Sequence, residues 1–102
     1  MEHGLAKMYA VISLSPDQVS AITGVVFETA FEDGFGYVLA ALLVTDSGKQ
    51  FSLRQYYRCR EKYPNVTELV GSERSDSPTA DLNEFLGVLG LSREHLAWQC
   101  SG

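Results

Sequence analysis

Cysteine, histidine and proline are scarce in this 102-residue sequence, and the scarcity excludes several kinds of protein. The two cysteines, Cys59 and Cys100, are too few for a disulfide framework, and neither belongs to a Cys-x-x-Cys pair. Free thiols are typical of a reducing compartment, so we expect a cytoplasmic protein. The longest apolar run, YVLAALLV at 37–44, is far shorter than the roughly 20 residues of a membrane-spanning helix.

The residues that usually perform catalysis do not occur in useful arrangements. Of the two histidines, His3 lies near the start of the chain and His95 falls on the polar side of a predicted helix. No Ser-His-Asp spacing, metal-ligand cluster, phosphate-binding loop or nucleophile elbow is found. Cys59 is expected to face inward from a strand as a packing residue rather than a nucleophile. The sequence therefore predicts no enzyme, no metal site and no cofactor.

The length and composition are those of one globular domain. With 45% hydrophobic and 21% charged residues, the chain can bury a core without metals or disulfides. We expect residues 1–7 to be a flexible leader and residues 8–102 to form a single α+β domain. A polar stretch at about 61–79, which includes SERSDSPT, is expected to be a connection with room for one short turn in EKYPNVTELVG.

A strand and a short helix are predicted at the start of the domain. Residues 8–14, MYAVISL, are rich in β-branched and aromatic side chains and predict a buried strand. Ser15 is a good N-cap, Pro16 suits the first helical position, and Gly24 can end the helix. Two alternatives stay open for residues 25–32, because their alternation favours a half-buried strand whereas helical spacing would continue the helix.

The centre of the chain predicts strands joined by tight turns. Asp33-Gly34 is a strong hairpin signal, because glycine tolerates positive φ. Residues 37–45 are apolar on both faces and predict a central strand, and residues 46–49 predict another turn. Residues 50–59 alternate again. With a strand at 25–32, these segments form a three-stranded antiparallel meander.

One segment invites comparison with a nucleic-acid-binding motif. GFGYV at 34–38 partly matches the octamer with which RNA-recognition motifs stack bases on a sheet. Asp33, however, stands where that octamer has a basic residue, and Ala40 stands where it has its last aromatic one. The segment is therefore interpreted as a turn, with Phe35 and Tyr37 beginning a core strand.

Two helices are predicted at the C-terminal end. Residues 77–90 carry apolar side chains at helical spacing, and Gly90 can end the helix. Ser92 is a suitable N-cap for a last helix over residues 93–99, REHLAWQ. A DNA-binding helix-turn-helix is the alternative, but its second helix would be short and poor in basic groups. We expect an α+β domain whose two C-terminal helices pack on one face of a mainly antiparallel sheet.

Charge is distributed unevenly along the chain. The net charge is −5, yet residues 49–62 hold five basic residues against one acid, a local charge of +4. The remaining chain holds three basic and twelve acidic residues, a charge of −9. On a continuous strand, alternation would place basic and aromatic groups on one face. This predicted basic stripe consists of Arg54, Tyr56, Arg58 and Arg60.

The predicted basic stripe is the candidate binding site. Arginine and tyrosine are enriched among side chains that dominate protein interfaces, which favours a protein partner. A nucleic-acid partner is the alternative, and a third is a solvated face whose arginines pair with Glu28 and Glu32. An exposed strand edge could also pair two copies as a homodimer. We expect a small non-catalytic regulator, inhibitor or adaptor, of the kind found among bacterial or phage accessory proteins, with no membrane partner.

Overall fold

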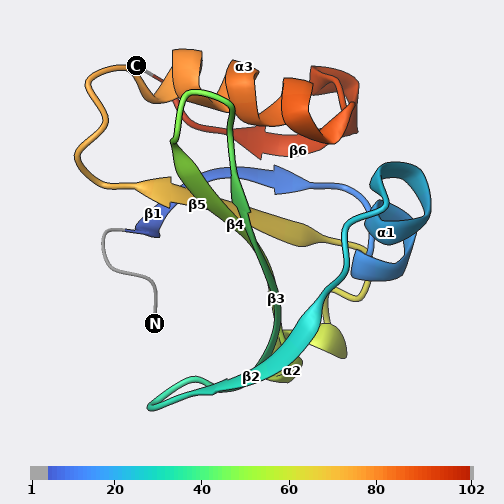
Figure 1. Cartoon of the computed structure of the whole chain (residues 1–102). Coiled ribbons are helices and arrows are strands. Elements are labelled where there is room, and N and C mark those ends of the chain that lie inside the picture. Colours follow the sequence, from blue (N-terminus) through green and yellow to red (C-terminus); the bar gives the residue numbers. More distant parts are fainter. Residues whose placement is uncertain (1–4, 102) are drawn as a thin grey trace.

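The computed structural model describes residues 5–101 and places their six strands in one antiparallel sheet (Figure 1). From edge to edge the strand order is β2-β3-β4-β5-β1-β6. The strands are β1 (Leu5–Ile12), β2 (Glu28–Glu32), β3 (Gly36–Val44), β4 (Gln50–Tyr56), β5 (Thr67–Ser72) and β6 (Leu96–Gln99). The helices are α1 (Pro16–Thr23), α2 (Tyr57–Arg60), α3 (Pro78–Leu89) and a 3-10 turn, η1 (Arg93–His95). The predicted class, a single α+β domain with a mainly antiparallel sheet and C-terminal helices packed on it, is confirmed.

Local signals in the sequence set the bounds of α1. Ser15 is the N-cap: its hydroxyl accepts the Gln18 N–H, and the Gln18 side chain accepts the Ser15 N–H, which is a capping box. Gly24, at φ +79°, ends the helix in the left-handed conformation that glycine favours. The strand alternative for the next segment is correct, but β2 begins only at Glu28.

The core lies between α3 and the sheet. The buried stripe of α3 consists of Leu82, Phe85, Leu86 and Leu89. Phe85 stacks on Phe51 of β4, with ring centroids 4.3 Å apart, and also contacts Tyr9 of β1, at 5.8 Å. Burying each of these large side chains contributes about 1.5–3 kcal/mol. This helical stripe therefore binds together β1 and β4, which lie on either side of β5 in the sheet.

The predicted connection at 61–79 contains a central strand, which is a correction. Thr67–Ser72 forms β5, which pairs antiparallel with both β4 and β1. Its residues are buried or half-buried along the whole strand, so both of its faces are covered. The segment VTELV offers β-branched residues, but polar neighbours on both sides masked that signal.

Two predicted bounds at the chain ends also need correction. β1 begins at Leu5, inside the predicted leader, whereas residues 1–4 lie outside the described part of the chain. The predicted last helix is only the turn η1, after which Leu96–Gln99 forms β6 beside β1. β6 is a short edge strand that pairs with the side of β1 that β5 leaves open. The N-cap pattern at Ser92 is local, so it could not indicate this long-range pairing.

A glycine in β5 makes room for the buried ring of Tyr9. A Cβ added at Gly71 would stand 2.9 Å from Cζ of Tyr9, whose ring is fully buried and whose hydroxyl donates to the Ser72 carbonyl at 2.6 Å. We expect Gly71→Ala to lower the free energy of unfolding by about 1–3 kcal/mol, because the core is overpacked. Gly87→Ala is the control. Nothing lies within 4 Å of that Cβ position in α3, and alanine should raise helix stability by up to about 1 kcal/mol. Urea unfolding measures both, and equal effects in one direction would refute this account.

Candidate interaction surface

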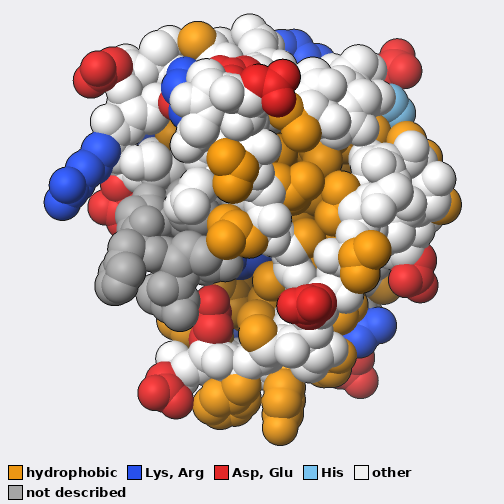
Figure 2. All heavy atoms as spheres, in the orientation of Figure 1, with side chains coloured by type: hydrophobic (Ala, Val, Ile, Leu, Met, Phe, Trp, Pro, Cys, Tyr) orange, Lys and Arg blue, Asp and Glu red, His pale blue; other side chains and the backbone are white. Residues whose placement is uncertain are grey.

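The β2–β3 hairpin carries exposed aromatic rings at the lower end of the molecule in Figure 1. Gly34 and Gly36, at φ +83° and +84°, allow the turn, and the Phe35 N–H donates to the Glu32 carbonyl at 3.1 Å. The hairpin predicted from Asp33-Gly34 is therefore confirmed. Figure 2 shows hydrophobic side chains projecting at this end, below a central hollow that is also lined by hydrophobic groups.

The exposed rings contact one another. Phe31 of β2 lies directly opposite Tyr37 of β3, with ring centroids 5.3 Å apart in an edge-on arrangement. Tyr57 of α2 follows at 6.0 Å from Tyr37, and its hydroxyl lies 3.1 Å from that of Thr29. Phe31 and Tyr37 remain 61% and 55% exposed. Such rings supply a large apolar area that packing within the described chain does not use.

The basic residues of α2 lie over aromatic rings, Arg60 over a ring of this group and Arg58 over the separate ring of Phe35. The guanidinium of Arg58 is 5.2 Å from the ring centroid of Phe35, and that of Arg60 is 4.9 Å from the ring of Tyr57. Both distances are within the range of cation–π attraction, worth about 0.5–1 kcal/mol at an exposed site. We call this the aromatic–basic surface; it comprises Phe31, Phe35, Tyr37, Tyr57, Arg58 and Arg60.

The predicted basic stripe is not continuous, which is a correction. β4 ends at Tyr56, and Arg58 and Arg60 belong to α2 instead of a strand. The physical reason is the antiparallel pairing of β4 with β5: the chain must reverse direction between Tyr56 and Thr67. The side chain of Gln55 fixes this reversal by donating to the carbonyls of Pro64 and Val66.

Arg54 is buried rather than exposed. Only 5% of its surface is accessible, and its Nε donates to the Ser52 hydroxyl at 3.1 Å. On the sheet it lies opposite Ala40 of β3 and Glu68 of β5. Burial raises the pKa of Glu68, and the positive charge of Arg54 opposes that rise. Arg54 is therefore part of the packed sheet and not of the exposed surface.

Tyr56 anchors the hairpin that carries the exposed rings. Its hydroxyl donates to a carboxylate oxygen of Glu32 at 2.9 Å, and its ring lies 5.7 Å from that of Phe35. Burial raises the pKa of Tyr56, and the hydrogen bond to Glu32 raises it further. Glu32, a candidate partner for the arginines in the sequence, accepts this tyrosine hydroxyl.

Several expected positions differ from those observed. Phe35 and Tyr37, predicted to begin a core strand, are 46% and 55% exposed because β2 and β3 extend beyond the part of the sheet that α3 covers (Figure 1). Cys59, predicted to face inward, is half-buried in α2, and Cys100 is buried; both are free thiols. The sequence shows that Phe31, Phe35 and Tyr37 lie close to one turn. It does not show that these three rings are exposed.

The charge around the aromatic–basic surface is nearly balanced. Three basic side chains belong to it or follow it: Arg58, Arg60 and Lys62, the last 5.5 Å over Tyr63. Four acids come from the same hairpin or the end of α2: Glu28, Glu32, Asp33 and Glu61. A surface of this composition combines apolar area with charges of both signs, and it lacks the strong positive potential typical of polyanion binding.

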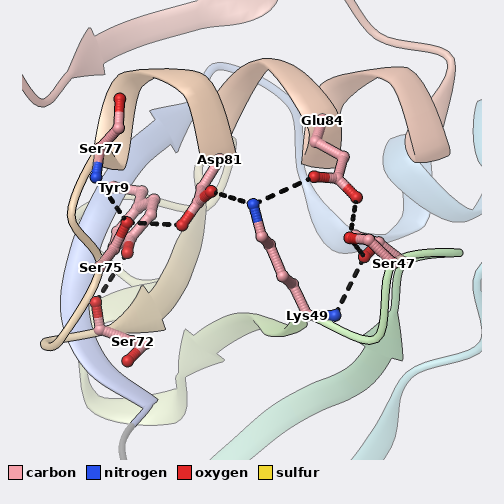
Figure 3. A network of polar contacts seen from close by, with 9 residues as sticks. Tyr9, Ser47, Lys49, Ser72, Ser75, Ser77, Asp81 and Glu84 are labelled. Carbon is pink, nitrogen blue, oxygen red and sulfur yellow. Dashed lines mark hydrogen bonds and ion pairs between the residues drawn. The ribbon is translucent and has the colours of Figure 1, made fainter.

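A second polar cluster lies at the opposite end of the β3–β4 hairpin and ties it to α3 (Figure 3). The Lys49 ammonium lies 2.6 Å from Asp81 and 3.4 Å from Glu84. Ser47 donates to Glu84 and Ser75 to Asp81, each at 2.5 Å. Lys49 and Ser47 of the β3–β4 turn thus contact Asp81 and Glu84 of α3, so this cluster holds the turn against the helix.

Comparison of the chain with protein-family models, with curated proteins and with solved structures gave no match. Within residues 5–101, no three His, Cys, Asp or Glu side chains are placed together so that they could hold a metal ion. No helix in that same range has the length and apolarity needed to cross a bilayer.

The Asp81 cluster should make stability depend on pH. Burial acts to raise the pKa of Asp81, but the hydrogen bonds from Lys49 and Ser75 outweigh it and lower the pKa overall. A lowered folded-state pKa stabilises the fold above the unfolded pKa of about 3.9 and loses that contribution as pH falls through the folded value. We expect Asp81→Asn to be less stable than wild type at neutral pH, with the gap narrowing below about pH 4. Urea unfolding across pH tests this, with the exposed Asp76→Asn as control. A gap that is constant with pH would contradict it.

Proposed function

We propose that this protein is a cytoplasmic, non-catalytic binding protein that recognises a protein partner through the aromatic–basic surface. The observation that carries the proposal is the set of exposed rings Phe31, Tyr37 and Tyr57, which contact one another in sequence, with Arg60 over Tyr57. Arg58 lies over the neighbouring ring of Phe35, which contacts Tyr56. Tyrosine and arginine dominate binding energy at protein interfaces when a partner covers them. A stoichiometric regulator, inhibitor or adaptor is the class of protein that such a surface on a small domain fits.

The arrangement of the surface supports recognition by preorganisation. The cross-strand pair Phe31 and Tyr37 is fixed by the hairpin register, and the hydrogen bond from Tyr56 to Glu32 holds the hairpin to β4. Rings held in place before binding lose little conformational entropy when a partner covers them. The cations over the rings match a partner that presents carboxylates beside an apolar patch.

Photo-crosslinking in cells tests the proposal directly. A photoreactive phenylalanine analogue at Tyr37 should give a covalent adduct with a protein partner, because this ring is at the centre of the aromatic–basic surface. The same analogue at Val88, which is 47% exposed on α3, is the positional control and should give no such adduct.

Charge reversal then separates a specific contact from non-specific crosslinking. Arg60→Glu should reduce the Tyr37 adduct by about tenfold or more, because Arg60 lies over Tyr57, which contacts Tyr37, and a hot-spot side chain contributes about 2 kcal/mol or more. Arg74→Glu is the matched control, since Arg74 is an exposed arginine in the loop after β5. If the adduct forms as well with Arg60→Glu as with Arg74→Glu, the proposal is wrong.

Nucleic acid is the second candidate, favoured by one observation: arginines stacked on exposed rings can also hold bases and phosphates. Since the surface is nearly balanced in charge, we expect labelled single-stranded and duplex oligonucleotides to show no salt-dependent binding in an anisotropy titration at low salt. Binding that weakens with salt and disappears in the Arg58→Ala, Arg60→Ala double variant would replace the protein partner by nucleic acid. Arg54 is left unchanged because it is buried.

A further inference from the structure

Half of strand β3 has an unoccupied edge. β2 pairs with β3 only over Gly36–Ala40, whereas β4 pairs with it over Val38–Val44. Within residues 5–101, no strand pairs with Ala41–Val44 on the side that faces away from β4. Residues 24–27 do not continue β2 along this edge. All four instead join α1 and Leu39 in lining a hollow of about 400 Å³.

The backbone groups of this edge point outward in a defined pattern. At the β3–β4 turn the Thr45 N–H donates to the Lys49 carbonyl at 2.8 Å, so Thr45 directs its backbone groups toward β4. In an antiparallel ladder these directions alternate along the strand. The N–H and C=O groups of Leu42 and Val44 therefore point to the unoccupied side.

The side chains of this edge are apolar and half-exposed. Leu42 is 51% and Val44 is 55% exposed, and the segment Ala41–Val44 has no charge, proline or bulge. Natural edge strands are usually protected by one of those features. β2, the outermost strand, shows the contrast, because it carries Glu28 and Glu32 along its five residues.

We propose that a second copy of this chain pairs with the Ala41–Val44 edge, antiparallel and across a two-fold axis at Leu43. This register sets Leu42 against Val44 of the partner copy and joins all the outward backbone groups of both in reciprocal hydrogen bonds. The same register places the apolar side chains of Leu42 and Val44 on one face as cross-strand pairs. The edge is thus complementary to itself, which is the requirement for an isologous dimer.

The contact is small, so the dimer is weak and concentration-dependent. A stable interface buries about 800 Å² per partner, more than a short edge strand alone supplies. The proposal goes beyond the partner-binding function and does not rest on it, because the aromatic–basic surface lies on the hairpin and α2 and not on this edge.

Sedimentation velocity over a roughly hundredfold concentration range tests the dimer. The average mass of the wild type should rise with concentration toward that of two chains. Leu42→Lys and Val44→Lys, each at a half-exposed position, should weaken dimerisation by about tenfold or more through like-charge repulsion across the edge. Val88→Lys on the outer face of α3 is the matched control and should dimerise as wild type does. Circular dichroism and urea unfolding identify any variant that does not fold.

Three results would overturn the proposal: a monomer at every concentration, a dimer that both folded lysine variants leave intact, or equal loss in Val88→Lys. Tyr37→Ala distinguishes this contact from self-association through the aromatic–basic surface. It should leave the dimer unchanged while it reduces partner binding, so the two proposals fail independently.

Discussion

The pairing of β5 on both of its sides is the constraint on which the rest of the structure depends. β5 joins β4 to β1, and without it the meander and the two chain-end strands would form separate sheets. Because β4 and β5 run antiparallel, the chain turns sharply after Tyr56, and α2 makes that turn. The position of Arg58 and Arg60 over the hairpin rings is a consequence of this reversal.

The same constraint separates two uses of basic side chains. Lys49 at the top of the β3–β4 hairpin meets Asp81 and Glu84, so its charge is neutralised within the fold. Arg58 and Arg60, carried past the end of the sheet, contact aromatic faces and stay exposed. The basic residues of 49–62 therefore occupy three different environments. Arg54 is buried, Lys49 forms an ion pair within the fold, and Arg58 and Arg60 lie on an exposed surface.

Short-range signals were predictable from the sequence, and long-range pairing was not. The Ser15 capping box, the Asp33-Gly34 turn and the apolar stripe of α3 depend on neighbours a few residues apart, and all three are confirmed. β5 and β6 are strands because β1 offers them an edge, which no local pattern records. The prediction of a continuous basic stripe was wrong for the same reason. The alternation at Arg54 and Tyr56 is a local pattern, and it cannot show that the strand ends where the chain turns toward β5.

The pairing of β1 also governs the order in which the chain can fold during synthesis. Val11 has its two partners at Glu68 and Trp98, far along the sequence. On the ribosome β1 therefore emerges without a neighbour, while the β2–β4 meander can pair locally. Contacts between residues so distant in sequence close slowly, because the intervening chain must lose much of its freedom first. We therefore expect completion of this sheet to follow the pairing of the β2–β4 meander.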